Sequence, residues 1–196
     1  MKKIILTLLL ILFLYSCSNV PVFESDEFGN LIDRANDRLY LYSGSHLRAS
    51  TIIEEPFARY DGDRTLHEIP GVDPAEWLSD NIRDLGMPLL FRESSIEEPT
   101  LENFGTERIH VTQVGDINTR IQMITDERHI QQIVDDYVHG ESVNRPLDVD
   151  RRLLFYFESP DYPGIYYVLD FFIGTDGREY LFNRWKDRCV IVTPFN

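Results

Sequence analysis

The side chains that could perform chemistry include five histidines, two cysteines and 33 acidic residues, and their spacing decides which chemistry is available. A serine precedes a histidine at Ser45-His46, but adjacent residues of a strand point to opposite faces. No G-x-S-x-G turn, which carries the nucleophile of many hydrolases, occurs in the chain. Zinc-type H-x3–5-H or H-E-x-x-H spacing is also missing from the five histidines, His46, His67, His110, His129 and His139. We therefore expect no catalytic residue, no metal site and no cofactor, and we expect solvated histidines.

One acidic segment and one isolated aspartate differ from the other carboxylates in their sequence context. Asp61–Thr65 places oxygen ligands at alternate positions, as a calcium-binding loop does, but Leu66 and Val72 stand where such a loop needs glycine and glutamate. We interpret this segment as a hairpin turn. Asp170 interrupts the apolar run 165–173, and it is expected on a solvent face, in a pair with Arg184, or in a pocket wall.

The two cysteines differ in their surroundings. Cys189 lies in the apolar run CVIV and is predicted to be a buried, unreactive thiol. Cys17 ends a different kind of segment: Lys2 and Lys3 are followed by the apolar run 4–15, which is short for a membrane span but long enough for a secretory signal.

The last four residues of this segment, Leu14 to Cys17, resemble the lipobox of bacterial lipoproteins. The resemblance implies cleavage before Cys17 and attachment of acyl chains such as palmitate to this residue, with two chains giving stable anchoring. It further implies a protein at the cell membrane, on the extracytoplasmic side, and the body resembles the small lipoproteins of Gram-positive bacteria. Tyr15 departs from this pattern, because the family usually has a smaller residue at that position. The alternatives to a lipoprotein signal are an uncleaved signal anchor and an ordinary signal peptide.

The formal net charge of −14 bears on partners. Nucleic-acid binding needs a basic face that neutralises phosphates, so we expect no nucleic-acid partner. The membrane, through the N-terminal lipid, and an envelope protein or cell-wall component are the expected partners.

Residue periodicity predicts the elements of the folded body. A first helix is expected from Asp73 to Leu85, and a second after Thr125 with the apolar stripe Ile130, Ile133, Val134, Tyr137 and Val138. Expected strands are 39–42, 48–60, 64–69, 87–93, 108–114, 117–124, 153–158, 165–173, 179–185 and 189–195, with a loop at 93–107. The last four strands have connectors too short for parallel crossovers.

These elements predict an α+β fold: a helix packed on an antiparallel β-meander, with a smaller N-terminal β-α-β portion. The order of elements is similar to cystatin-like helix-and-sheet scaffolds. We divide the chain into a signal peptide at 1–16, a flexible tether at 17–38 and a single domain at 39–196, with a subdivision into 39–95 and 105–196 as the alternative.

The expected function is that of a membrane-anchored envelope lipoprotein with a non-catalytic binding role. Tyr, Trp and Arg side chains on an exposed sheet face are typical of interfaces. The candidates for such contacts are Tyr166, Tyr180, Arg184 and Trp185, whereas Phe155, Phe157, Phe171 and Phe172 are assigned to the core. The alternatives are an extracellular hydrolase that uses paired carboxylates on a wall polymer, and a lipoprotein that binds a small ligand or an ion.

Overall fold

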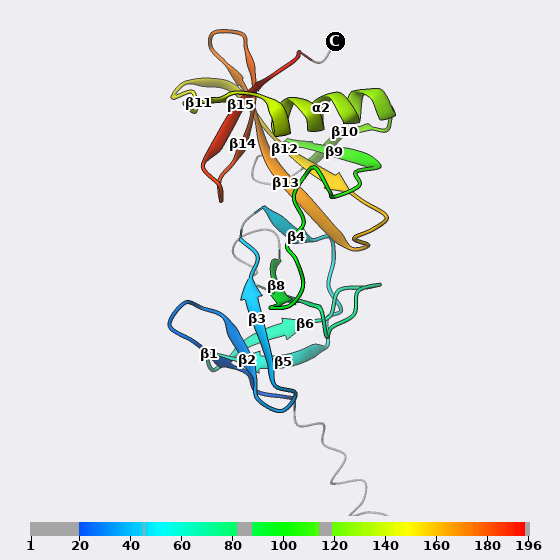
Figure 1. Cartoon of the computed structure of the whole chain (residues 1–196), viewed down its shortest axis with the longest axis vertical. Coiled ribbons are helices and arrows are strands. Elements are labelled where there is room, and N and C mark those ends of the chain that lie inside the picture. Colours follow the sequence, from blue (N-terminus) through cyan, green and yellow to red (C-terminus); the bar gives the residue numbers. More distant parts are fainter. Residues whose placement is uncertain (1–19, 45, 82–87, 114–118, 195–196) are drawn as a thin grey trace, which may run out of the picture.

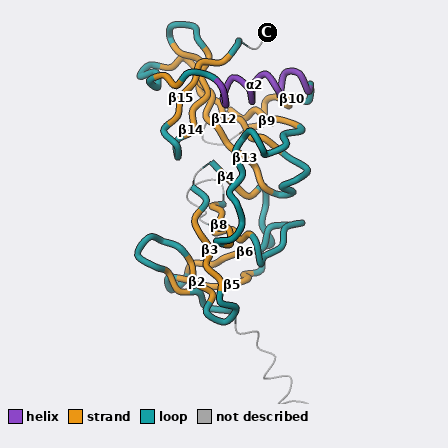
Figure 2. The backbone as a smooth tube through the Cα atoms, in the orientation of Figure 1, coloured by secondary structure: helices purple, strands orange, loops and turns teal. Residues whose placement is uncertain are grey.

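A computed structural model describes residues 20–44, 46–81, 88–113 and 119–194. Within these ranges the chain is mostly β: fifteen strands belong to one sheet, every strand pair is antiparallel, and the one helix is α2 (Glu127–His139). The predicted α+β class is therefore wrong. Figures 1 and 2 show that strands fill both halves of the molecule, while α2 lies on one half only.

The N-terminal half contains eight short strands and has a core of its own. Its buried side chains include Phe23, Leu31, Tyr40 and Leu66. The strands are β1 (Glu24–Ser25), β2 (Leu31–Asp33), β3 (Arg38–Tyr42), β4 (Leu47–Ala49), β5 (Pro56–Tyr60), β6 (Arg64–His67), β7 (Trp77–Asp80) and β8 (Leu89–Glu93).

The C-terminal half contains the longer strands and the helix. Its core joins Ile130 and Ile133 of the helix to Phe155, Phe157 and Phe171 of the sheet, as predicted for these phenylalanines. The strands are β9 (Arg108–Gln113), β10 (Thr119–Ile124), β11 (Ser142–Val143), β12 (Val149–Glu158), β13 (Ile165–Gly174), β14 (Glu179–Asn183) and β15 (Arg188–Val192). The strands β12 to β15 pair in sequence order, which confirms the predicted meander.

Strand β4 connects the two halves, because it pairs with β8 on one side and with β13 on the other. Both β4 and β14 pair with β13, β4 at residues 165–167 and β14 at residues 170–173. Figure 1 shows β4 between the lower strands and the upper ones. This arrangement places side chains of β4 and of the β14–β15 turn close together.

The helix predicted over 73–85 is not formed in its described part. Asp73 does accept a hydrogen bond from the Ala75 amide (2.8 Å), but the helical turn it starts is followed at once by β7. All four residues of β7 are buried between β6 and β8. Burial on both faces and strand pairing outweigh a local helix signal, because propensity is a weak preference. Residues 82–85 lie outside the described residues.

The predicted tether is too long. Strands β1 and β2 lie within 17–38, the side chain of Phe23 is 3% exposed, and Leu31 is fully buried. Phe23 also donates its amide hydrogen to the carbonyl of Arg59 (2.7 Å). Short polar strands with few apolar residues give little periodicity, so the segment resembles a linker until its contacts with β3 and β5 are known.

The second helix and the hairpin at 61–63 agree with the sequence. Helix α2 begins one residue later than expected, with Asp126 as its cap, whose carboxylate accepts from the His129 amide (3.0 Å). Asp61 and Gly62 both have positive φ angles and join β5 to β6, so the turn interpretation is confirmed.

Candidate functional site

The strands β12, β13 and β14 have one face toward α2 and an opposite face that is rich in arginine. Side chains alternate along a strand, so the neighbours of the core phenylalanines point away from the helix. We call this surface the arginine face. It comprises Arg48, Arg145, Arg152 and Arg184 together with Tyr156, Tyr166, Asp170, Phe172 and Phe182.

Asp170 lies at the centre of this face and is 4% exposed. Its Oδ1 accepts from Nε of Arg152 (2.8 Å), and its Oδ2 accepts from Nε of Arg184 (2.7 Å). Second contacts come from Nη2 of Arg152 (2.7 Å) and Nη2 of Arg184 (3.2 Å), both to Oδ1. Burial raises the pKa of Asp170, and the guanidinium groups of Arg152 and Arg145 oppose that rise.

Of the three expected settings of Asp170, the pair with Arg184 is confirmed and the solvent face is wrong. Arg152 is a partner that sequence reasoning missed. Arg152 is aligned with Phe172 on β13, so it reaches Asp170 diagonally across the strand pair. The signal that could have found it is the even spacing of Arg152 and Tyr156 on the face that also carries Asp170.

Arg145 brings a third positive charge to the face. Its guanidinium lies 5.0 Å from the ring centre of Phe172 and 5.1 Å from that of Phe182. Such stacking holds an arginine in place while its edges remain free to donate hydrogen bonds. Two guanidinium groups thus bind one carboxylate and a third acts on it through its charge, in a chain that is strongly acidic as a whole.

The face extends along β13 toward β4. Tyr166 is half-buried, is aligned with Arg48 of β4, and packs against Tyr156 with 5.7 Å between ring centres. The ring of His110 on β9 lies 5.5 Å from Tyr166, and its Nε2 is 2.5 Å from the carboxylate of Glu158. This end of the face is therefore composed of phenol rings beside a histidine–carboxylate pair.

The four predicted contact residues have different environments. Tyr166 and Arg184 both belong to the arginine face. Tyr180 is 6% exposed, and its hydroxyl donates to Asp176 (2.8 Å), so its expected exposure is wrong. Trp185 is 52% exposed and lies on the turn directly after Arg184.

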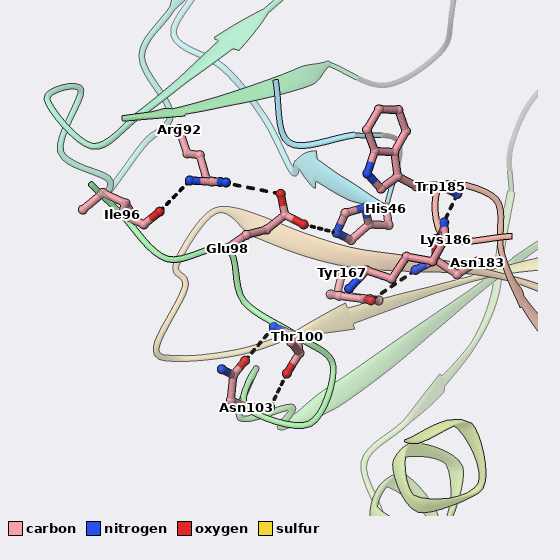
Figure 3. A network of polar contacts seen from close by, with 10 residues as sticks. All are labelled: His46, Arg92, Ile96, Glu98, Thr100, Asn103, Tyr167, Asn183, Trp185 and Lys186. Carbon is pink, nitrogen blue, oxygen red and sulfur yellow. Dashed lines mark hydrogen bonds and ion pairs between the residues drawn. The ribbon is translucent and has the colours of Figure 1, made fainter. Parts of the chain in front are cut away.

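That turn is held by Asn183, which is fully buried (Figure 3). Its Oδ1 accepts from the backbone amides of Trp185 (3.0 Å) and Lys186 (3.1 Å), and its Nδ2 donates to the hydroxyl of Tyr167 (3.2 Å). The turn carrying Arg184 and Trp185 is thus fixed to the interior of β13.

A second polar cluster joins the two halves of the molecule (Figure 3). His46, just before β4, is 1% exposed, and its Nε2 lies 3.0 Å from the carboxylate of Glu98. The other carboxylate oxygen is 3.6 Å from Nε of Arg92, which also donates from Nη1 to the carbonyl of Ile96 (2.6 Å). The His46 ring packs edge-on against Tyr167.

This second cluster has a structural role, because His46 is too deeply buried to meet a substrate. Burial acts to raise the pKa of Glu98, but His46, Arg92 and Lys186 outweigh it, so the pKa lies below its ordinary value. The cluster fixes the loop after β8 against β4 and β13. The expectation of solvated histidines is wrong for His46, and also for His67 and His110, which are 3% and 6% exposed.

His67 lines an open pocket of about 690 Å³, together with Thr51, Ile52, Glu54, Pro56, Thr65 and Asn81. Its Nδ1 lies 2.8 Å from the carbonyl of Ile53, which can only accept, so Nδ1 carries the proton. Its Nε2 then accepts from the hydroxyl of Thr65 (2.8 Å). Both ring nitrogens therefore have a partner inside the protein. Through Nδ1, His67 of β6 holds the loop that connects β4 with β5.

Cys189 is 2% exposed, and burial raises the pKa of its thiol to about 11, which confirms a buried thiol. Within the described ranges, no three His, Cys, Asp or Glu side chains converge on a point that could hold a metal ion. The predicted lipidation site, Cys17, lies outside the described residues. The helix that the structure describes is not long and apolar enough to cross a membrane. No protein-family model, curated protein or solved structure matches the chain.

Proposed function

We propose that this protein is a lipid-anchored, extracytoplasmic binding protein and that the arginine face is the surface with which it contacts an anionic partner. The observation that carries the proposal is the pairing of Arg152 and Arg184 with one buried carboxylate, Asp170, beside Arg145, which stacks on rings of the same face. Planar guanidinium groups match carboxylate and phosphate oxygens with two parallel hydrogen bonds. A local excess of positive charge on an acidic chain selects an anionic group at this place and repels polyanions elsewhere.

The lipobox supports the anchored part of the proposal. Cys17 would carry the acyl chains, and Phe23, the first core residue, follows six positions later. A fully extended chain of this length spans about 20 Å. The half that contains β1 and β2 would therefore stay next to the membrane, and the other half would project away from it (Figure 1).

The arrangement of side chains supports binding as the role of this face. Arg152 and Arg184 are held in place by Asp170, and Arg145 is held by two rings, so little conformational freedom is lost when a ligand is bound. The side chain of Arg184 is 51% exposed and that of Arg152 is 35% exposed. Preorganised, accessible arginines are common binding hot spots.

The membrane anchor is tested with a Cys17→Ala variant. Wild-type protein is expected in the membrane fraction with the mass of a cleaved, acylated chain, and the variant is expected to lack the acyl mass. A variant that remains membrane-bound with an unchanged mass would contradict the anchor.

The binding role is tested by crosslinking in intact cells followed by affinity capture. Arg145→Gln removes a charge that stacks on rings, and Arg178→Gln removes an exposed arginine from the β13–β14 turn, so the two variants have equal net charge. The partner captured by wild type should be retained by Arg178→Gln and lost with Arg145→Gln. Equal capture by both variants would overturn the proposal.

A further inference from the structure

Among the residues that the structure describes, the fourth arginine of the face, Arg48, has neither the carboxylate that pairs with Arg152 and Arg184 nor the two rings that stack on Arg145. Arg48 is half-buried in the middle of β4. Its Nη1 atom is buried with no hydrogen-bond partner, and no ion pair joins it to a carboxylate in the part of the chain that the structure describes. A half-buried cation without a carboxylate partner is unfavourable, so an anion that paired with this guanidinium would gain a strong interaction.

Two phenols flank this guanidinium. Burial lowers the pKa of Arg48, and Tyr42 and Tyr156 counteract part of this effect. Burial also raises the pKa of Tyr156 to about 12, so its hydroxyl stays protonated near neutral pH. This neutral phenol does not supply a compensating negative charge; it supplies an additional hydrogen-bond donor beside the guanidinium.

Tyr42 also connects Arg48 to Trp185. The Tyr42 and Trp185 rings meet edge-on, with 5.4 Å between their centres. One face of the Trp185 indole lies against Gly44, where a Cβ atom would fall 2.6 Å from the indole Cδ2. The side chain is nevertheless 52% exposed, so the indole presents open aromatic surface next to the phenol that contacts Arg48.

We infer that Arg48 and Trp185 form a binding subsite for a sugar that carries a carboxylate or phosphate group. The oxyanion pairs with Arg48 between Tyr42 and Tyr156, and the apolar C–H face of the sugar ring stacks on the exposed indole. The inference rests on the proposed function, because it names the ligand class of the same face. A single charged sugar fits better than a long polyanion, since the chain as a whole has a formal net charge of −14.

The first experiment uses tryptophan fluorescence of the full chain, purified from membranes in a neutral detergent. Trp77 is 3% exposed and Trp185 is 52% exposed, and they are the two tryptophans of the chain, so a ligand at the surface reports through Trp185. Galacturonic acid is titrated beside its methyl ester, and glucose 1-phosphate beside glucose. Each pair has matching sugar rings and differs in the oxyanion.

We expect quenching by at least one charged probe and at least about tenfold weaker binding of its neutral counterpart. Comparing the two charged probes distinguishes a carboxylate ligand from a phosphate ligand. Equal binding of charged and neutral probes would overturn the inference, and so would the absence of quenching by every probe. These comparisons use the wild-type chain, so they hold even if a variant fails to fold.

The second experiment compares variants by calorimetric titration of the charged probe that binds. Arg48→Gln and Trp185→Ala are each expected to raise its Kd at least about tenfold, whereas Arg178→Gln is expected to leave it unchanged. Arg48→Lys retains the charge and should have an intermediate Kd, because an ammonium lacks the planar donor pair. Unchanged binding by folded Arg48→Gln would contradict the inference.

The two proposals can fail separately. Loss of partner capture with Arg145→Gln does not depend on Arg48 or Trp185. If capture depends on Arg145 but no charged sugar binds, the sugar subsite is wrong and the binding role stands. If a charged sugar binds through Arg48 while capture is insensitive to Arg145, the subsite stands and the role assigned to the rest of the face is wrong.

Discussion

The indole ring of Trp185 lies directly against Gly44, a residue with a φ angle of +70° in the connection between β3 and β4. Two independent requirements meet at this glycine. Its backbone conformation is strained for any residue with a Cβ atom, and a Cβ atom there would collide with the indole. The contact joins the N-terminal half to the β14–β15 turn, which also carries Arg184.

Replacing Gly44 with alanine should therefore destabilise the protein and displace the indole. The left-handed conformation costs roughly 1–2 kcal/mol for alanine, and the collision adds about 1–3 kcal/mol. Urea unfolding measures the free energy, and the fluorescence maximum reports on the Trp185 environment. Gly62→Ala is the matched control, because Gly62 has a φ angle of +82° but open space around it. Equal losses in the two variants would mean that contact with Trp185 contributes nothing.

Asp170 and Arg184 are predicted to be energetically coupled. Asp170→Asn leaves Arg152 and Arg184 without their shared carboxylate, and the side chain of Asp170 is 5% exposed, so we expect a loss of about 2–4 kcal/mol in unfolding free energy. A double-mutant cycle with Arg184→Gln should give a coupling of about 1–3 kcal/mol. The exposed pair Glu24–Arg34 serves as a comparison and should have little coupling. Additive effects of the Asp170 and Arg184 substitutions would contradict the geometry.

Glu98 is expected to contribute to the acid sensitivity of the fold. Its pKa is lowered from 4.5 in the folded protein. The unfolded chain therefore takes up the proton first as pH falls, and the stabilisation by Glu98 is present above pH 4.5 and is lost as pH falls through the folded pKa. Glu98→Gln should lower stability at neutral pH and make the decline below about pH 5 shallower.

The measurement is the free energy of unfolding in urea at several pH values between about 7 and 3. Glu97→Gln is the control, since Glu97 is the exposed neighbour of Glu98 and this substitution removes the same charge. If the free energy of unfolding declined as steeply with falling pH in Glu98→Gln as in Glu97→Gln, the contacts of Glu98 with His46 and Arg92 would not depend on its charge.

Cys189 should react slowly with thiol reagents in the folded protein. Its thiol is 2% exposed and has a pKa of about 11, so the reactive thiolate is scarce near neutral pH and is shielded from the reagent. Iodoacetamide at about pH 8 should modify it much faster in concentrated urea than in buffer, as followed by mass spectrometry of the Cys17→Ala variant. Equal rates in urea and buffer would contradict the burial of β15.

Local patterns in the sequence are sufficient for part of this fold. The apolar stripe from Ile130 to Val138 predicts α2, because its spacing matches the repeat of about 3.6 residues per helical turn. The capping residue Asp126 lies directly before the helix. The connectors between β12, β13, β14 and β15 are too short for parallel crossovers. The antiparallel pairing of these strands therefore follows from the length of the connectors alone. Asp170 and Arg184 are close for the same reason, since they lie on adjacent strands of one meander.

Pairing between distant segments could not be derived in this way. The residues Trp77–Asp80 have a helix-like spacing with their neighbours, yet they form β7 because β6 and β8 enclose them. The segment around β1 lacks periodicity and still enters a core through Phe23. In both cases burial against residues far along the chain outweighs a local preference of less than about 1 kcal/mol per residue.

The sequence by itself therefore determined the acidic charge, the candidate lipidation site, one helix and the meander, and it offered the Asp170–Arg184 pair as one of three possible settings of Asp170. The tertiary structure decided which arginines share a surface. Arg48, Arg145 and Arg184 come from three separate segments, and β13 brings two of them together because β4 and β14 pair with successive parts of it. Pairing of distant strands depends on the complementary burial of whole surfaces, and no short stretch of sequence contains that information.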